Sequence, residues 1–522
     1  MDLLDARARP HPLHSQHSPH SQRFSCKPTL LAAIAAAVLL AGCAVGPDYA
    51  RPPVEVPTAY KEDQGWKPAD PQVIDAAHPW WDLYGDLTLS ALVAQANQAN
   101  QNIRQAEAVY REARALGDAA RAGFAPTVGL NAGAARAKTD TSGAVRLGDA
   151  YSLGLSASWE PDVWGAVHRA VEAGDASVQA SAADLAGARL SIQSTLVQDY
   201  LQGRGIDLQR KLYAATIDCY DKSLALTRHQ YAAGVVLRSD VALAESQLAT
   251  AQAQAVDLEQ QRSLLEHAIA VLTGQHPSNF TLAPVDATAD AGHLAVPVIP
   301  PGLPSTLLER RPDIAAAERR MSAANAQIGV AQAAFYPQLM LSASGGFNAA
   351  SLGALFDTPS RVFSLGTALA QTVFDGGLRR AHSDQAIATY DAAVALYKQT
   401  VLAGFQQVED DLATLRVLEH ESQLQAKAVE SAQLSERLAT SQYRAGTTSY
   451  VNVVTAQALS LTAQRSAAQL LGRRLVASVG LIAATGGGWR TPDSDPAHAH
   501  AAAAAVAAFP QAVAGLPARS GN

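Results

Sequence analysis

The residues of this sequence with the chemistry to bind a metal ion are histidines near the N-terminus. His11, His14, His17 and His20 recur at every third position, and short His-rich tracts are common metal-binding segments. The tract lies in a basic stretch that we expect to be removed with an export signal, so we assign no metal function to it. The later histidines His168, His229, His267 and His276 stand apart from one another and pair with no cysteine.

Cys43 is the residue with the clearest covalent chemistry. Basic residues up to Lys27, an apolar run from Leu30 to Leu40 and the small residues Ala41-Gly42 precede it, which is the layout of a secretory signal. A cysteine directly after Leu-Ala-Gly resembles the bacterial lipoprotein box, in which the cysteine is lipidated and becomes the first mature residue. Ala44 follows it, which by the same resemblance suits sorting to the outer membrane. The alternative is an ordinary signal with an incidental cysteine.

The composition excludes several other functions. The chain has 522 residues, 48% of them hydrophobic and 17% charged, with a net charge of −7. This acidic balance argues against nucleic acid as a partner, because phosphate binding requires clustered Lys and Arg. Cys26, Cys43 and Cys219 cannot build a disulfide scaffold or a four-thiolate zinc site. No Gly-rich loop precedes a lysine, and no window reaches the ~18–20 continuous apolar residues of a spanning helix. We therefore expect no enzyme, no cofactor, no metal site and no helical membrane domain.

The mature chain contains one unit twice. Dispersed pairs of short motifs recur at a nearly constant offset of 211 or 212 residues, which indicates a tandem duplication. The pairs are Phe124-Ala125-Pro126 with Phe335-Tyr336-Pro337, Gly165 with Gly376, Tyr231 to Gly234 with Tyr443 to Gly446, and Thr273-Gly274 with Thr485-Gly486.

Each copy has the same predicted order of elements. A helix comes first, at about 87–122 and about 305–334, and each ends before a proline that prevents its continuation. Two strands of about 9–11 residues follow, the length of a tilted membrane-spanning strand. In 151–159 apolar residues alternate with small polar ones, the pattern of a half-buried strand. The connections 137–150 and 348–361 are expected to be exposed loops.

Very long helices complete each copy. No proline occurs from Asp162 to His276 or from Ser360 to Thr491, and each stretch is interrupted once, at Gly234 or Gly446, where glycine suits the end of a helix. A helix from Ala166 to Gln230 would be roughly 100 Å long at 1.5 Å per residue. That length exceeds an ordinary globular domain.

The four predicted strands cannot close a membrane barrel, since bacterial barrels begin at about eight strands. Open edges in lipid would leave backbone groups unsatisfied, so the chain must pool strands with copies of itself. Two copies would give a filled interior and three would leave room for a lumen. The alternative is a soluble Ala-rich coiled-coil protein whose strands form a small sheet.

Five segments carry a family resemblance: Leu307 to Ile314, Ala317 to Val330, Gly46 to Pro52, Trp80 to Asp86 and Trp159 to Gly165. They closely resemble the corresponding segments of the TolC/OprM/NodT family of outer-membrane efflux proteins. The resemblance extends from about Cys43 to Gly487. It implies a mixed α and β fold: a homotrimeric outer-membrane β-barrel of four strands per protomer, twelve in all, continued by a periplasmic α-helical barrel. It also implies docking to a periplasmic adaptor and an inner-membrane pump that expels small molecules.

The resemblance further indicates which residues meet the adaptor. In the family, the helix turns at the periplasmic tips carry a glycine and contact it. Here these turns match Gly234, Val235, Gly446 and Thr447. The plain alternative is that both glycines only cap helices.

The turn of helix after each tip lines the constriction in the family, where aspartates often form a ring that favours cations. Ser239 and Asp240 match that position in the first copy. We therefore expect one acidic ring from Asp240. The alternative is that Ser239 and Asp240 only cap the returning helix, a position both residue types favour.

The second copy departs from the family pattern at the same constriction. Asn452 and Thr455 stand where relatives often carry acids, and Thr448 replaces an arginine that ties the gate in some of them. Tyr443 keeps an aromatic hydrogen-bond donor. We expect a gate held by hydrogen bonds and packing rather than by a salt bridge.

These observations predict a division of the chain into six segments. They are a signal peptide at 1–42, an N-terminal linker and equatorial segment at 43–85, a first efflux repeat at 86–276, a linker at 277–303, a second repeat at 304–487 and a tail at 488–522. Arg310-Arg311 and Arg319-Arg320 are expected to be solvated charges on a helix.

The favoured function is a passive outer-membrane conduit that exports drugs or other small toxic compounds. A type I protein secretion duct is the alternative within transport, and a structural coiled-coil lipoprotein without a pore is the alternative outside it. The lipoprotein box and the Gly46-Pro47-Asp48-Tyr49 start favour efflux.

Overall fold

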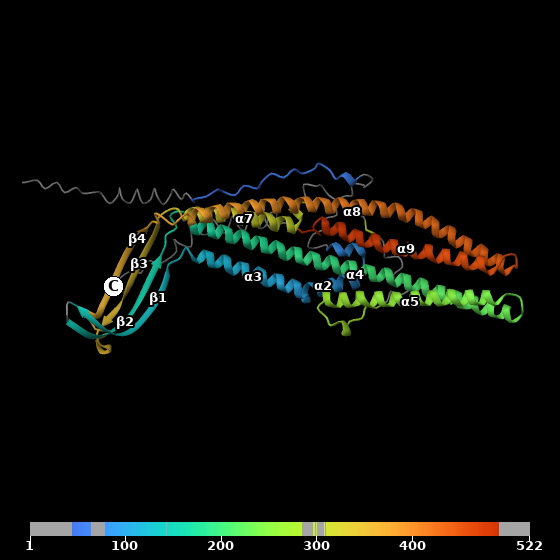
Figure 1. Cartoon of the computed structure of the whole chain (residues 1–522), viewed down its shortest axis with the longest axis horizontal. Coiled ribbons are helices and arrows are strands. Elements are labelled where there is room, and N and C mark those ends of the chain that lie inside the picture. Colours follow the sequence, from blue (N-terminus) through green and yellow to red (C-terminus); the bar gives the residue numbers. More distant parts are fainter. Residues whose placement is uncertain are drawn as a thin grey trace, which may run out of the picture.

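One end of the molecule is a four-stranded sheet, and long helices run from it to two hairpin tips at the other end (Figure 1). The computed structural model describes residues 44–63, 79–141, 144–283, 296–297, 299, 307 and 309–489. The predicted signal, the lipid site at Cys43 and nearly all of the predicted tail lie outside the described residues.

The strands pair in the order β1-β2-β3-β4, each antiparallel to its neighbour. Their bounds are β1 Thr127–Thr141, β2 Ala144–Trp159, β3 Gln338–Ala349 and β4 Arg361–Ala370. Strands β1 and β2 are 15 and 16 residues long, so the predicted length of 9–11 and the predicted loop at 137–150 were wrong for this hairpin. An antiparallel ladder is formed by the backbone and tolerates polar side chains, and Arg136 pairs with Asp149 across it at 3.2 Å.

The two faces of the sheet differ in chemistry. Residues directly opposite each other in the register point to the same face. The pair Leu130 and Leu155 and the pair Ala343 and Leu365 lie on one face. On this face Leu130 is 71% exposed and Leu365 79% exposed. The opposite face carries small polar residues, with Gly129, Ser156, Ser344 and Ser364 in one cross-strand row. The sheet therefore presents an uncovered apolar face and a small, polar one.

Two helices of 67 residues leave the sheet, α4 at Ala166–Ala232 and α8 at Leu378–Arg444. Each is about 100 Å long at 1.5 Å per residue, as the absence of proline predicts. The returning helices are α5 at Arg238–Leu272 and α9 at Tyr450–Ala484. The α4–α5 and α8–α9 hairpins end together, far from the sheet (Figure 1).

The first helix of each copy is shorter than predicted. The segment 87–122 is two helices, α2 at Leu87–Ala99 and α3 at Gln101–Ala122, because Asn100 leaves the helical conformation and caps α3 by accepting from the Asn102 and Ile103 N–H groups. In the second copy α7 spans Pro312–Ala333, since proline fits the first turn of a helix.

Arg311 corrects the expectation of solvated charges before α7. Its side chain is buried, and its guanidinium donates to the Ala484 carbonyl oxygen at 2.9 Å and to Gln407 at 3.1 Å. It therefore ties the start of α7 to the end of α9. Arg319 and Arg320 instead pair with Glu318 and Asp184.

The main hydrophobic core lies midway along the helices. Trp80 and Leu89 pack there against residues of α4, α8 and α9 such as Tyr200, Leu412 and Val479. In the described part of the chain, α9 is the single helix that is long and apolar enough to cross a membrane. Of its most apolar window, 39% is buried inside the molecule. The contribution of α9 to this core accounts for its apolarity.

The segment from Ala44 to Asp63 runs beside the helices (Figure 1). The Val45 N–H donates to the Trp164 carbonyl oxygen at 3.1 Å, and Tyr49 donates to Glu318 at 2.6 Å. Arg169 is nearly buried and pairs with Asp48 at 2.7 Å. These contacts hold residue 44 where β2 passes into α4.

Gly346 and Gly345 in β3 provide a matched test of the sheet. A Cβ on Gly346 would lie 2.3 Å from the Leu153 carbonyl oxygen, whereas one on Gly345 would meet nothing within 4 Å. We expect Gly346→Ala to lower the melting temperature of the detergent-purified protein by several degrees, since overpacking costs about 1–3 kcal/mol. Gly345→Ala should melt with the wild type; equal melting of both variants would contradict this account of the β2–β3 contact.

Candidate functional site

The two hairpin tips are built alike, as the duplication predicts. Gly234 and Gly446 adopt positive φ values of 73° and 71°, a conformation that side-chain-bearing residues rarely adopt. After them, the Val235 N–H donates to the Gln230 carbonyl oxygen at 2.8 Å and the Thr447 N–H to that of Gln442 at 2.9 Å. Both glycines therefore end their helices. The tight turns leave the next residues projecting from the molecule.

The first tip presents apolar side chains to solvent. Val235 is 71% exposed and Leu237 is 72% exposed. The sequence analysis predicted that Val235 contacts a partner and did not predict this for Leu237. The position of Leu237, two residues after Val235 in the same short turn, could have suggested it. In the second tip the matching residue to Val235 is Thr447, whose hydroxyl donates to the Gln442 carbonyl oxygen at 3.0 Å.

Tyr443 joins the two hairpins. Its hydroxyl donates to the Gln230 side-chain oxygen at 2.5 Å, so a residue of α8 is bonded to one of α4. Its ring lies 5.4 Å from that of Tyr450. Burial is the main cause that raises the pKa of Tyr443, and the charge of Asp240 adds to it. The hydroxyl therefore stays protonated and able to donate.

A small hydrophobic cluster supports this tie. Helices α4, α5 and α9 contribute its buried residues, which are Leu224, Val241, Ala244, Tyr450 and Val453. Tyr443 of α8 packs against the cluster. The Tyr450 hydroxyl also lies 3.2 Å from that of Ser223. Sequence reasoning missed Gln230, Tyr450 and Ser223 because only the folded geometry brings them to Tyr443.

Asp240 stands in the first turn of α5 and is half-buried. Its carboxylate accepts from the Leu237 N–H at 3.2 Å, and its own N–H donates to the Leu237 carbonyl oxygen at 3.1 Å. Asp240 thus stabilises the start of α5, and its charge also lies at the tip. Ser239 is exposed beside it.

The second copy has no acid at this place. The Asn452 amide donates to the Thr448 hydroxyl at 2.7 Å, and Thr455 donates to the Val451 carbonyl oxygen of its own helix at 2.9 Å. The polar groups of these residues are therefore satisfied within α9 and the turn before it. The structure packs Tyr443 against the cluster, with the charge of Asp240 near its hydroxyl, and leaves Thr448 half-buried in the turn and Asn452 and Thr455 exposed on α9.

The sequence matches the family model described as outer membrane efflux protein over residues 92–275 and 303–487. It is 33% identical to the pyoverdine export outer membrane protein OpmQ of Pseudomonas aeruginosa over 423 residues, 79% of this chain and 88% of the relative. It is 30% identical to the toluene efflux pump outer membrane protein TtgF of Pseudomonas putida over 480 residues, 89% of this chain and 98% of the relative. The fold is similar to that of the outer-membrane channel OprN, with a TM-score of 0.79 and 32% identity over 86% of this chain and 100% of that one.

Removing the Tyr443 hydroxyl should loosen the tips. Because a net hydrogen bond contributes about 1 kcal/mol, we expect Tyr443→Phe to speed amide hydrogen exchange several-fold at residues 225–236 and 440–449. Tyr231, the repeat equivalent of Tyr443, is 44% exposed and its ring lies beneath Arg238 instead. Tyr231→Phe is the matched control and should leave exchange unchanged; equal effects of both variants would refute a specific tie.

Proposed function

Since the chain belongs to the outer membrane efflux protein family, we propose that three copies of it assemble into one continuous duct from the periplasm to the exterior. The protein is an outer-membrane efflux channel and extends from the outer membrane into the periplasm. The observation that carries the assembly is the sheet: its edge strands β1 and β4 each have one pairing partner among the described residues, and its apolar face is exposed. Twelve pooled strands would pair both edges and turn the apolar face to lipid, with the serine and glycine rows facing the lumen.

A periplasmic adaptor is the proposed partner of the hairpin tips, and an inner-membrane pump supplies the energy. Exposed Val235 and Leu237 support the first part, because apolar side chains at a projecting turn favour burial against a partner. We propose no catalytic step and no cofactor, since a passive conduit requires neither. The proposed cargo is small toxic compounds, as the relatives named for pyoverdine export and toluene efflux suggest.

Lipid attachment at Cys43 is part of this proposal. Val45 is bonded to Trp164, and a Cβ on Gly165 would lie 2.7 Å from the Ala44 Cα, so the residue after Cys43 is held where the sheet meets the helices. Trp164 stacks on Tyr336 there with ring centroids 4.9 Å apart. Aromatic residues of this kind gather at membrane interfaces, so acyl chains on Cys43 would enter the bilayer at that level.

The gate is proposed at the tips, where Tyr443 and its cluster hold the α4–α5 and α8–α9 hairpins together. In the trimer Asp240 would recur three-fold around the constriction and favour cations. No salt bridge is required for this closed state, because the hairpins are joined by the Tyr443–Gln230 and Tyr450–Ser223 hydrogen bonds and by apolar packing.

Efflux is tested by deleting the gene for this chain and restoring wild-type or Cys43→Ser copies. We expect the deletion to make cells several-fold more sensitive to some drugs or organic acids, and the wild type to restore resistance. The Cys43→Ser copy should restore less, because loss of the anchor lowers its retention in the outer membrane. Unchanged sensitivity across a broad panel would favour protein secretion or a structural role.

The acidic ring is tested by conductance of the purified protein in planar bilayers. Asp240→Asn keeps an oxygen that can accept from the Leu237 N–H and removes the charge, so it should lower cation selectivity with little loss of stability. Asp240→Ala removes both and should also raise conductance. If selectivity is the same in all three proteins, Asp240 is a helix cap only.

A further inference from the structure

A groove of about 710 Å³ lies where α4, α5, α8 and α9 meet. Tyr200, Leu412 and Val479 of these helices point to the midway core, whereas Gln202, Asp411 and Gly480 line the groove. The groove therefore lies on a different side of these helices from the core that α2 and residues 80–84 cover. We place this side on the tunnel wall of the proposed trimer, and the following inference rests on the proposed function in this respect.

The walls of the groove carry many side-chain amides. Its glutamines are Gln198, Gln202, Gln209, Gln254, Gln261 and Gln469. Gln261 donates to Asp257 at 2.7 Å and Gln209 makes a long contact of 3.4 Å with the Gly205 carbonyl oxygen. Amides can both donate to and accept from a solute. Apolar contacts are available from Tyr213 and Leu258 in the same groove.

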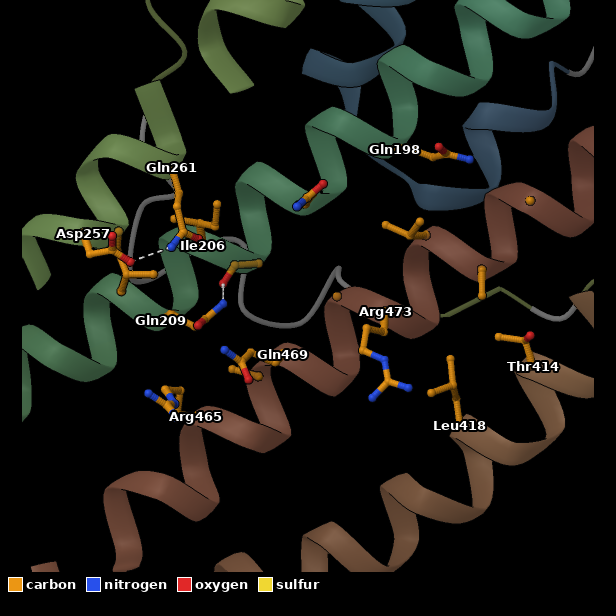
Figure 2. Close-up of a pocket in the computed structure, with 18 of the residues that line it drawn as sticks. Gln198, Ile206, Gln209, Asp257, Gln261, Thr414, Leu418, Arg465, Gln469 and Arg473 are labelled. Atoms are coloured by element: carbon orange, nitrogen blue, oxygen red, sulfur yellow. Dashed lines mark hydrogen bonds between the residues drawn. The ribbon is translucent and has the colours of Figure 1, made fainter. Parts of the chain in front are cut away.

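Arg465 is a charged donor in the same groove as these amides. Its Nε atom is buried and has no hydrogen-bond partner in the described part of the chain. Figure 2 shows Arg465, Gln469 and Gln209 gathered at one end of the groove. Arg473 lies toward the other end and is engaged by Glu421 at 3.6 Å.

Asp411 forms the far end of the groove. One of its oxygens is buried without a partner among the described residues, and a Cβ on Gly480 of α9 would lie 3.0 Å from the other. Burial, with some repulsion from Asp410 and against the attraction of Arg311, raises the pKa of Asp411 to about 6. The negative charge of Asp411 is therefore partly lost as the pH falls toward and below 6.

We propose that this groove is a transient binding station for small organic anions that bear a ring and hydroxyl groups, as they pass along the tunnel. The Arg465 guanidinium matches a carboxylate, to which it can donate two parallel hydrogen bonds. The amides bind hydroxyls, and Tyr213 and Leu258 contact the ring. The volume lies within the range of small-molecule sites. Binding in an open wall is weak enough to let the solute leave.

The test is block of the ion current of wild-type protein in planar bilayers by salicylate, an aromatic carboxylate with one hydroxyl. We expect concentration-dependent block, and Arg465→Gln should raise the half-blocking concentration about tenfold, the loss of one charge-assisted hydrogen bond. Arg474→Gln is the matched control: Arg474 is on the same helix, pairs with Glu419 and does not line the groove. It should leave the block unchanged.

A protein that conducts but is blocked equally with and without Arg465 would overturn the binding station and leave the efflux channel intact. A protein that does not conduct at all, even with the tip tie removed, would instead contradict the channel.

Discussion

The four-stranded sheet is the constraint on which the rest of the structure depends. Within the described part of the chain each of its outer strands pairs on one side only, and one face is apolar and exposed. In lipid, unpaired backbone groups cost several kcal/mol each, so a single protomer is not a stable membrane structure. Closure between copies satisfies both edges at once. In the proposed trimer, the helices that leave the strands after Gly165 and Gly377 would then stand side by side in a ring, and the tunnel would follow from the barrel.

Elements governed by local chemistry could be predicted from the sequence, and those governed by tertiary contacts could not. The long helices follow from the absence of proline, and their turns follow from Gly234 and Gly446. The break at Asn100 was missed because its cause is partly remote: the Asn100 amide donates to the Leu272 carbonyl oxygen at 2.9 Å. The burial of Arg311 depends in the same way on Ala484 at the opposite end of the second repeat.

The candidate site divides along the same line. Resemblance and repeat spacing located the tips, and the expectation that Asp240 could act as a cap follows from residue type alone. The structure adds its acceptor role toward the Leu237 N–H. The sequence could not predict the hydrogen-bond partner of Tyr443. Gln230 and its repeat equivalent Gln442 are the same residue type, and nothing in the sequence marks Gln230 as the one that accepts from this tyrosine.

The duplication thus produced two similar hairpins that use equivalent tyrosines differently. Tyr443 bonds across to Gln230, whereas Tyr231 stacks beneath Arg238 at its own tip. Each hydrogen bond contributes about 1 kcal/mol, so the Tyr443 and Tyr450 bonds of three protomers and their small clusters hold the proposed gate closed only weakly. A buried ion pair would cost several kcal/mol to break and would demand a partner that replaces the lost charge. A weak, uncharged tie can instead be released by apolar burial at the tips, which leaves control of opening with the partner that docks there.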